Sequence, residues 1–251
     1  MREMMAEQSH IVALSGGKDS TAMALRLAEV EPQEYSYAIT PTGDELPEMF
    51  DHWKKLEVLL GQRLTVLTSG YSLSGLIRKK KALPNWRMRF CTPVLKIQPF
   101  NAHLMENRPA VSYVGLRADE PADVRRGAVF GNVEGITQRF PLREWGWTIN
   151  DVWAYLDAQG VTIPARTDCA RCFFQTLGEW WWLWKENLEE YLDAEAEEEE
   201  TGHTFRSPQR DSWPTSLVDL RREFEKDHIP KGAGQLDLMG GRPNMCRVCS
   251  L

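Results

Sequence analysis

Hydrophobic and polar positions in the first 160 residues alternate between the spacing of strands and that of helices. Short runs rich in apolar and β-branched residues predict strands at residues 10–14, 35–40, 63–67 and 110–116. Apolar residues recur at helical spacing in residues 21–28 and 48–60. Strands that alternate with helices favour a parallel sheet with right-handed crossovers. We therefore expect an α/β fold, a parallel twisted sheet with helices on both faces.

Beyond this region the pattern changes, and we expect a domain of residues 1–160 with a helical, cysteine-containing region of residues 161–251 packed on it. A tryptophan-rich helix is predicted from Trp180 to Tyr191, with its tryptophans in a core or interface. The acidic residues 197–200 are typical of a solvated helix end or a loop. Another helix is predicted near residues 217–226.

A turn of serines and glycines joins the first predicted strand to the first predicted helix. It consists of Ser15, Gly16, Gly17, Lys18, Asp19 and Ser20. The two glycines let the main chain approach a ligand, and their N–H groups join those of the helix start in an anion cradle. The Walker phosphate loop is longer, so this turn predicts a different phosphate loop. A Gly-rich turn that only caps the helix is the alternative.

Composition narrows the class of protein. The net charge of −6 argues against a general nucleic-acid binder, which usually has a basic excess. Residues 78–89 are nevertheless basic and favour a local anion-binding surface, although residues 78–81 alone are more typical of a solvated face. Because no apolar run is long enough to span a membrane and residues 1–9 do not resemble a signal peptide, we expect a cytoplasmic protein without membrane contact.

Four of the five cysteines form two C-x-x-C pairs. Cys169 pairs with Cys172, Cys246 pairs with Cys249, and Cys91 stands apart. In a reducing compartment such pairs favour metal or redox chemistry over disulfides. Both zinc and an iron–sulfur cluster suit a site of four thiolates, and spacing alone favours zinc.

These motifs resemble those of a known superfamily. The pattern S-G-G-x-D-S at residues 15–20 is similar to the PP-loop of ATP pyrophosphatases. The patterns T-G-x-E-x-P-E at residues 42–48 and R-F-C-T-x-x-x-K-x-x-P at residues 89–99 are similar to segments of phosphoadenylyl-sulfate (PAPS) reductase-like proteins. The resemblance runs from residue 11 to about residue 172 and implies an adenine nucleotide alpha hydrolase-like fold.

The resemblance also implies which residues contact the nucleotide or a substrate anion. Besides the six residues of the first loop these are Thr42, Gly43, Glu45, Arg89, Lys96, Arg117, Glu120 and Arg125, or Arg126 in place of Arg125. Lys18, Asp19 and Cys91 are implied to act in catalysis, with Asp19 as a Mg²⁺ ligand or a carboxylate that organises the loop. A surface ion pair is the alternative for Arg117 and Glu120.

Two chemistries of the family stay open. In the first, a substrate oxygen takes AMP from ATP, pyrophosphate leaves, and sulfur then displaces AMP. In the second, a cysteine thiolate attacks a sulfonucleotide (PAPS or APS) and sulfite is released. The family's reductases carry E-C-G-[LI]-H around this cysteine, and residues 245–251 lack that pattern, which favours the first chemistry. A non-catalytic nucleotide-binding module with structural zinc is a third interpretation.

The favoured interpretation implies ATP, Mg²⁺ and a [4Fe–4S] cluster as cofactors, with zinc as the alternative to the cluster. The resemblance implies Cys91, Cys169, Cys172 and one of Cys246 and Cys249 as ligands; alternatively the two pairs bind the metal and Cys91 stays free. The partners left open are a sulfur-donor protein of the cysteine desulfurase type, a nucleic-acid substrate and a second copy of the chain in a homodimer.

Overall fold

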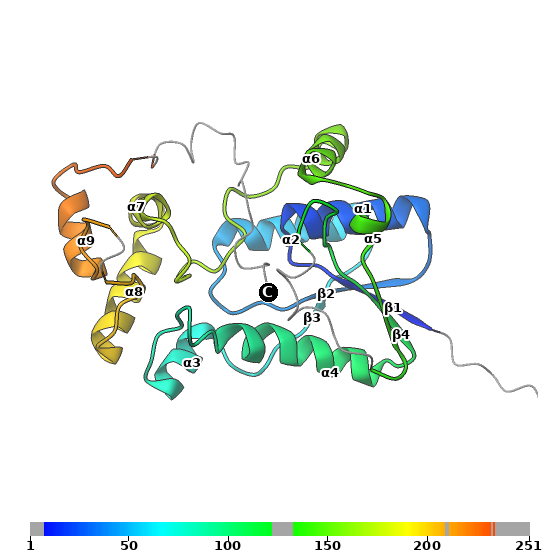
Figure 1. The fold of residues 1–251 in the computed structure, drawn as a ribbon, viewed down its shortest axis with the longest axis horizontal. Helices are drawn as coiled ribbons and strands as arrows, with labels where there is room; N and C mark the ends of the chain where they lie inside the picture. Colours follow the sequence, from blue (N-terminus) through cyan, green and yellow to red (C-terminus); the bar gives the residue numbers. More distant parts are fainter. Residues whose placement is uncertain (1–7, 122–132, 209–210, 232, 234–251) are drawn as a thin grey trace, which may run out of the picture.

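The first strand of the chain lies at the centre of the sheet. The computed structural model describes residues 8–121, 133–208, 211–231 and 233. Within them, five parallel strands pair in the order β3-β2-β1-β4-β5 (Figure 1). They are β1 (Ser9–Ala13), β2 (Tyr35–Ile39), β3 (Thr65–Val66), β4 (Ala110–Tyr113) and β5 (Ile136–Arg139). Because the strand order reverses beside β1, the switch point of this doubly wound sheet lies between β1 and β4.

Helices cover both faces of the sheet, which confirms the predicted α/β fold (Figure 1). One face carries α1 (Lys18–Val30), α2 (Pro47–Leu60), α5 (Pro141–Glu144) and α6 (Ile149–Ala158), and the other carries α4 (Gln98–Glu106) after a π-helical turn, η1 (Pro93–Ile97). Successive residues of β1 point to opposite faces of the sheet. Val12 packs in the core with α1, whereas Ile11 packs with Leu104 of α4.

Beside the sheet, four helices share a separate core. They are α3 (Leu73–Lys80), α7 (Leu177–Glu186), α8 (Leu188–Thr201) and α9 (Leu217–Phe224), at the left of Figure 1. Trp180 and Tyr191 are completely buried at its centre. Trp181 is buried too, and Trp182 and Trp184 pack against this core, as predicted for the tryptophans. Leu73 and Ile77 of α3 join the same core, so a helix from the first half of the chain packs with the C-terminal helices.

The single helix predicted from Trp180 to Tyr191 was wrong. The chain leaves helical geometry at Asn187 (φ −139°, ψ 63°), which ends α7 and precedes α8. The Asn187 N–H still donates to the Leu183 carbonyl at 2.8 Å, closing the last turn of α7. Asparagine is a weaker helix former than leucine or glutamate, although the Asn187 side chain makes no capping hydrogen bond at this break.

The prediction that residues 197–200 are solvated was also wrong in part. Glu197 and Glu198 of α8 are buried, whereas Glu199 and Glu200 are exposed. Glu198 accepts hydrogen bonds from the N–H of Phe205 (2.8 Å) and of Leu217 (2.7 Å), and so it fixes the loop between α8 and α9. Charge density alone cannot show which side of a helix faces a core.

Other differences concern short elements. The strand expected at 63–67 shrinks to β3, and the strand expected at 110–116 ends at Tyr113. The sequence patterns did not predict β5, α3 or α4. In β5 the sequence Ile-Thr-Gln-Arg has one strongly apolar residue, which is too weak a signal for a strand at the sheet edge. No helix in the described segments is long and apolar enough to cross a membrane.

Glu198 makes a testable contribution to stability. Burial raises the pKa of Glu198 from 4.5 to about 7, so between these values the folded protein holds a proton that the unfolded chain releases. The contribution of Glu198 is therefore complete below pH 4.5 and is lost as pH rises through about 7, by at most about 3 kcal/mol. Denaturant titrations at acidic and neutral pH should show a smaller pH dependence of the unfolding free energy in Glu198→Gln than in the wild type. Exposed Glu199→Gln is the matched control, and an unchanged dependence in Glu198→Gln would contradict this assignment.

Candidate functional site

Three loops meet at the carboxyl edge of the sheet, beside the switch point. They follow β1 (residues 15–20), β2 (residues 42–46) and β4 (residues 115–120). A Cβ built on Gly115 would lie 3.2 Å from the carbonyl carbon of Asp19, so the end of β4 presses closely on the start of α1. Ligands of doubly wound sheets bind at this edge, which agrees with the position predicted for the first two loops.

The loop after β1 is a preformed anion cradle. Gly16 has φ +85°, and a Cβ there would lie 2.7 Å from Nε1 of Trp53, so only glycine fits this turn. The hydroxyls of Ser15 and Ser20 lie 3.0 Å apart, and the Gly17 N–H donates to the Ser15 hydroxyl at 3.2 Å. No side chain of the described residues caps α1, which leaves the N–H groups of its first turn for an anion.

A cluster of buried charges supports this cradle. Asp19 Oδ2 lies 3.3 Å from Lys18 Nζ and 2.9 Å from Arg117 Nη1. Arg117 also bonds Asp119 at 2.8 Å, and its N–H donates to Glu120 at 2.9 Å. Arg117 Nη1 also lies 3.8 Å from Glu120, so the ion pair considered from the sequence exists, but Arg117 is buried rather than on the surface. Its bond to Asp19 orients that carboxylate. Oδ1 of Asp19 is buried and has no hydrogen-bond partner among the described residues.

The loop after β2 is folded around Glu45. Its carboxylate accepts hydrogen bonds from the N–H groups of Thr42 (2.7 Å), Gly43 (3.0 Å) and Asp44 (3.2 Å), and from the Thr42 hydroxyl (2.7 Å). Gly43 has φ +74°, and a Cβ there would lie 2.9 Å from Cβ of Ser72. Glu45 and Gly43 therefore shape the loop.

The loop that carries the C-x-x-C pair contacts both of these loops. Thr167 Oγ1 lies 3.6 Å from the position of a Cβ on Gly17, and Cys169 Sγ lies 3.3 Å from Thr42 Oγ1. The Ala170 N–H donates to the Asp44 carbonyl at 2.7 Å. The C-x-x-C pair therefore lies beside the loops after β1 and β2, although it is far from them in sequence.

Arg171 ties this junction together, and sequence analysis missed it. Its N–H donates to Asp44 Oδ2 at 2.9 Å, its guanidinium pairs with the same carboxylate, and Nη1 donates to Glu197 of α8 at 3.2 Å. Although burial opposes its charge, Asp44 and then Glu197 keep the pKa of Arg171 above its ordinary value. The sequence does show an arginine between the two cysteines of the C-x-x-C pair. If that arginine is buried, its guanidinium needs a carboxylate partner, which could have suggested this ion pair.

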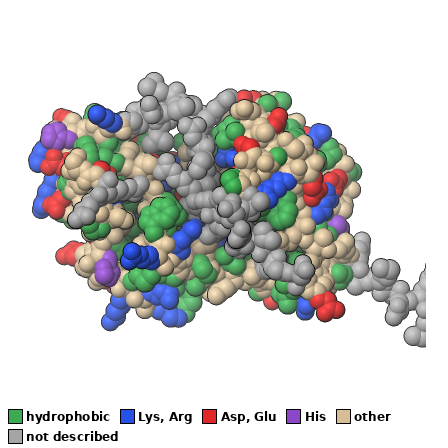
Figure 2. Space-filling view, in the orientation of Figure 1, with side chains coloured by type: hydrophobic (Ala, Val, Ile, Leu, Met, Phe, Trp, Pro, Cys, Tyr) green, Lys and Arg blue, Asp and Glu red, His purple; other side chains and the backbone are tan. Residues whose placement is uncertain are grey.

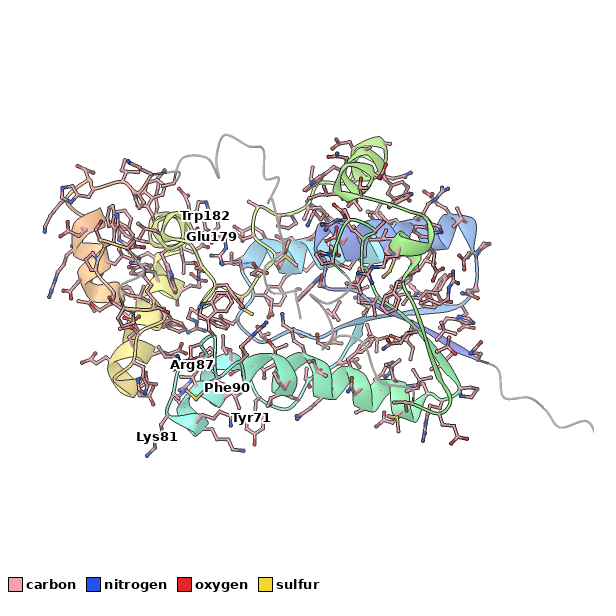
Figure 3. All side chains as sticks on the ribbon, viewed as in Figure 1. Tyr71, Lys81, Arg87, Phe90, Glu179 and Trp182 are labelled. Carbon is pink, nitrogen blue, oxygen red and sulfur yellow. The ribbon has the colours of Figure 1, made fainter. Side chains whose placement is uncertain are left out.

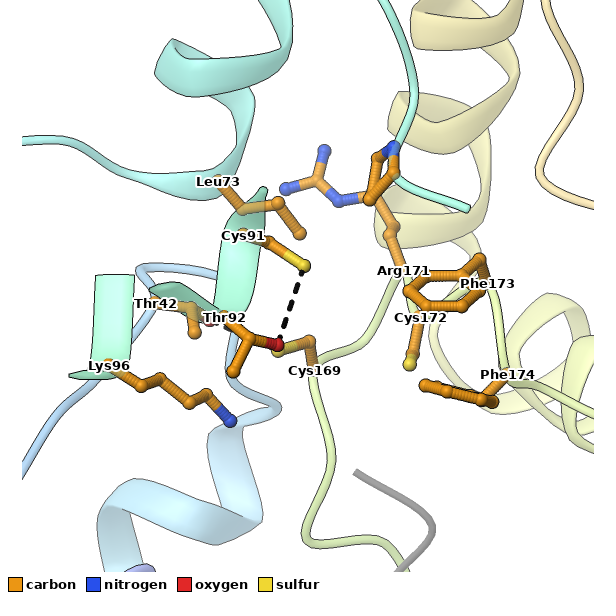
Figure 4. A pocket seen from close by; sticks show the side chains of 11 residues that line it. Thr42, Leu73, Cys91, Thr92, Lys96, Cys169, Arg171, Cys172, Phe173 and Phe174 are labelled. Carbon is orange, nitrogen blue, oxygen red and sulfur yellow. Dashed lines mark hydrogen bonds between the residues drawn. The ribbon is translucent and has the colours of Figure 1, made fainter. Parts of the chain in front are cut away.

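Three cysteines border one small cavity (Figure 4). Its volume is about 20 Å³, enough for about one water molecule. Thr42, Leu73, Pro84, Cys91, Thr92, Lys96, Cys169, Arg171, Cys172, Phe173 and Phe174 line it. Burial raises the pKa of Cys169 to about 12 and that of Cys172 well above its ordinary value, so both are thiols at neutral pH unless a metal displaces their protons.

The remaining predicted site residues lie around this cavity or outside the described residues. Lys96 of η1 faces the cavity, and the guanidinium of Arg89 lies over the Phe174 ring, 5.0 Å from its centre. Cys246, Cys249, Arg125 and Arg126 lie outside the described residues. Among the segments that the structure describes, no three His, Cys, Asp or Glu side chains form a group able to hold a metal.

One family model covers most of the chain. Residues 9–180 match the model described as the phosphoadenosine phosphosulfate reductase domain. Two curated proteins, each called sulfate adenylyltransferase subunit 2, from Mycobacterium sp. strains KMS and MCS, are 28% identical to this chain over 193 residues. The match covers 65% of this chain and 60% of each relative, so the chain spans about 60% of their length.

A crystal structure of phosphoadenylyl-sulfate (PAPS) reductase from Candida auris has a TM-score of 0.49 and 15% identity, and covers 64% of this chain and 77% of that one. The family match includes the loops after β1, β2 and β4 and both described cysteines of the C-x-x-C pair. The chain belongs to the phosphoadenosine phosphosulfate reductase domain family of enzymes.

Proposed function

We propose that the protein binds ATP at residues 15–20, transfers AMP to a substrate oxygen and uses its cysteine site to bring sulfur to the activated position. The substrate oxygen bonds to the α-phosphorus, the α–β phosphoanhydride breaks and pyrophosphate leaves. The terminal sulfur of a persulfide on a donor protein of the cysteine desulfurase type then bonds to the activated atom, and AMP leaves with the oxygen. A thiol reductant cleaves the S–S bond that still joins product and donor. The order of steps follows from the need to turn a hydroxyl-type oxygen into a leaving group.

The observation that carries this proposal is the junction of the three loops. Cys169 contacts Thr42, and Thr167 approaches Gly17, so the thiols lie beside the loops to which we assign the nucleotide, which supports the proposal. A non-catalytic nucleotide-binding module would not require thiols next to its nucleotide loops.

The residues of the cradle supply electrostatic stabilisation. The free N–H groups at the start of α1 and the ammonium of Lys18 favour the negative charge that develops on departing pyrophosphate. Asp19 Oδ1, buried without a partner among the described residues, is a carboxylate oxygen of the type that Mg²⁺ binds. Bound there, Mg²⁺ would supply Lewis-acid stabilisation of phosphate oxygens. Arg117 keeps Asp19 in place.

The cavity suits a thiophilic metal in its chemistry. Its lining contains three thiols and no carboxylate, and the charge of Lys96 favours the thiolate form of Cys169. We propose that Cys91, Cys169 and Cys172 hold a [4Fe–4S] cluster together with Cys246 or Cys249, or that the two pairs hold it and Cys91 stays free. The volume of about 20 Å³ is nearer to the size of one zinc ion than to that of a cluster, and either metal requires the thiols to move, so zinc is the second candidate.

A sulfonucleotide reductase is the second candidate function, because the family is named for that reaction. Its catalytic thiol would be Cys246 or Cys249, which lie outside the described residues. Residues 245–251 lack the E-C-G-[LI]-H pattern of the family's reductases, which favours ATP-dependent activation.

ATP binding tests the role of the cradle. Lys18→Ala should weaken MgATP binding about tenfold or more in calorimetry, because a charged donor to phosphate is lost. It should also stop release of pyrophosphate in the presence of an acceptor. Exposed Lys54→Ala is the matched control. Unchanged affinity in Lys18→Ala would contradict the assignment, and sulfite release from PAPS without ATP would favour the reductase.

Metal content tests the cysteine site. Anaerobically purified protein should contain about four iron atoms and four sulfides per chain, with a broad absorbance near 400 nm. Cys169→Ser and Cys172→Ser should lose the iron because each removes a thiolate ligand, and Cys91→Ser distinguishes the two ligand sets. One zinc ion per chain without colour, or full iron content in Cys169→Ser, would contradict the cluster.

A further inference from the structure

An exposed basic and aromatic surface lies at the end of α3, next to the cysteine cavity. We call it the α3 surface and define it as residues 78–81, Tyr71, Trp86 and Arg87. Figure 3 shows Tyr71, Lys81 and Arg87 gathered around α3, and Figure 2 shows Lys and Arg side chains clustered on the same edge. All of these residues are exposed, and Trp86 is 64% exposed. The function proposed above assigns them no role.

No carboxylate in the described part of the chain neutralises the cations of this surface. Residues 78–81 and Arg87 provide five positive charges, and none of them pairs with a carboxylate among the described residues. Lys79 instead bonds the Tyr71 hydroxyl at 2.5 Å, and Lys80 lies over the Phe90 ring. The C-terminus of α3 favours cations in its last turn, but this does not account for Lys81 and Arg87, which lie beyond the helix. Five adjacent like charges in a chain of net charge −6 indicate an anionic ligand.

Trp86 is exposed and yet held in a fixed position. Its ring packs edge-on against Phe174, with centres 4.4 Å apart. The turn that carries it is closed by hydrogen bonds between the backbones of Asn85 and Met88, and the Asn85 side chain accepts from the N–H of Arg87 at 2.9 Å. Fixed exposed tryptophans are suited to stacking because little conformational entropy is lost on binding.

The surface adjoins the thiols directly. Phe174, which supports Trp86, and Pro84, two residues before it, both line the cysteine cavity. At the other end of α3, the Leu73 N–H donates to the Thr42 carbonyl at 2.8 Å, so the helix is anchored to the nucleotide loop. A ligand on the α3 surface therefore lies beside the proposed sulfur site.

We propose that the α3 surface binds single-stranded nucleic acid, with a base stacked on Trp86 and phosphates on the cations of residues 78–81 and Arg87. A flexible strand offers both unstacked bases and regularly spaced phosphates, which match an exposed indole beside a row of cations. An acidic protein segment would satisfy the cations but not the fixed indole. The proposal rests on the proposed function in one respect, that the bound strand is its sulfur acceptor.

Fluorescence anisotropy of a labelled oligothymidylate of about 20 nucleotides tests the surface, with no ATP present and salt varied from about 50 to 200 mM. Wild-type protein should bind with an affinity that falls with salt. Lys80→Gln/Lys81→Gln should bind more weakly and reduce the slope of log affinity against log salt by about 1.4, since each lost phosphate contact contributes about 0.7. Trp86→Ala should bind about tenfold more weakly with an unchanged slope.

Lys54→Gln/Lys226→Gln is the matched control, because it removes the same charge from exposed positions elsewhere. Absence of binding at about 50 mM salt would overturn the proposal, as would equal losses in the control. Unchanged affinity in Trp86→Ala, with heparin bound as tightly as the oligonucleotide, would show a general polyanion or acidic-protein site and overturn it too. Wild-type protein that binds the oligonucleotide but not ATP would contradict the proposed function and leave this surface standing.

Discussion

The buried ion pair between Asp44 and Arg171 is the interaction on which the site depends. It joins the loop after β2 to the loop of Cys169 and Cys172, and Glu197 extends it to α8. Removing one partner of such a pair leaves an uncompensated buried charge, which typically costs about 3–5 kcal/mol. The pair therefore fixes three parts of the chain in one relative position, and the cysteine loop cannot separate from the loop after β2 without exposing it.

Because of this ion pair, the C-terminal helices also position the cysteine loop. The glutamates of α8 that looked like a solvated acidic stretch are buried because two of them hold other elements: Glu197 bonds Arg171, and Glu198 bonds the backbone on both sides of the loop before α9. The cysteine loop also packs on the helical core, since Cys172 and Trp180 belong to the same buried cluster. In the sheet domain, Arg117 has a similar role, because its hydrogen bond holds the Asp19 carboxylate beside the loop after β1.

Local patterns predicted the parallel sheet, the helices on both faces and the phosphate loop, because each rests on neighbouring residues. The strand-to-helix turn with Gly16 is an example, since its positive φ and close approach to Trp53 need only the local sequence and one packed helix. Long-range charge pairing was not predictable. Arg171 and Asp44 are 127 residues apart, and the sequence around either residue does not indicate that the two side chains pair. The burial of Glu198 was missed for the same reason, because a face of a helix is polar or buried according to what packs on it.

The central claim is that nucleotide binding and the cysteine loop form one site. The most direct measurement is the rate at which iodoacetamide labels Cys169 in metal-free protein, followed by peptide mass spectrometry with and without MgATP. Because Cys169 contacts Thr42 beside the phosphate loop, MgATP should change that rate severalfold in the wild type and leave it unchanged in Lys18→Ala. Wild-type protein that binds MgATP but labels Cys169 at the same rate in its presence would contradict the account.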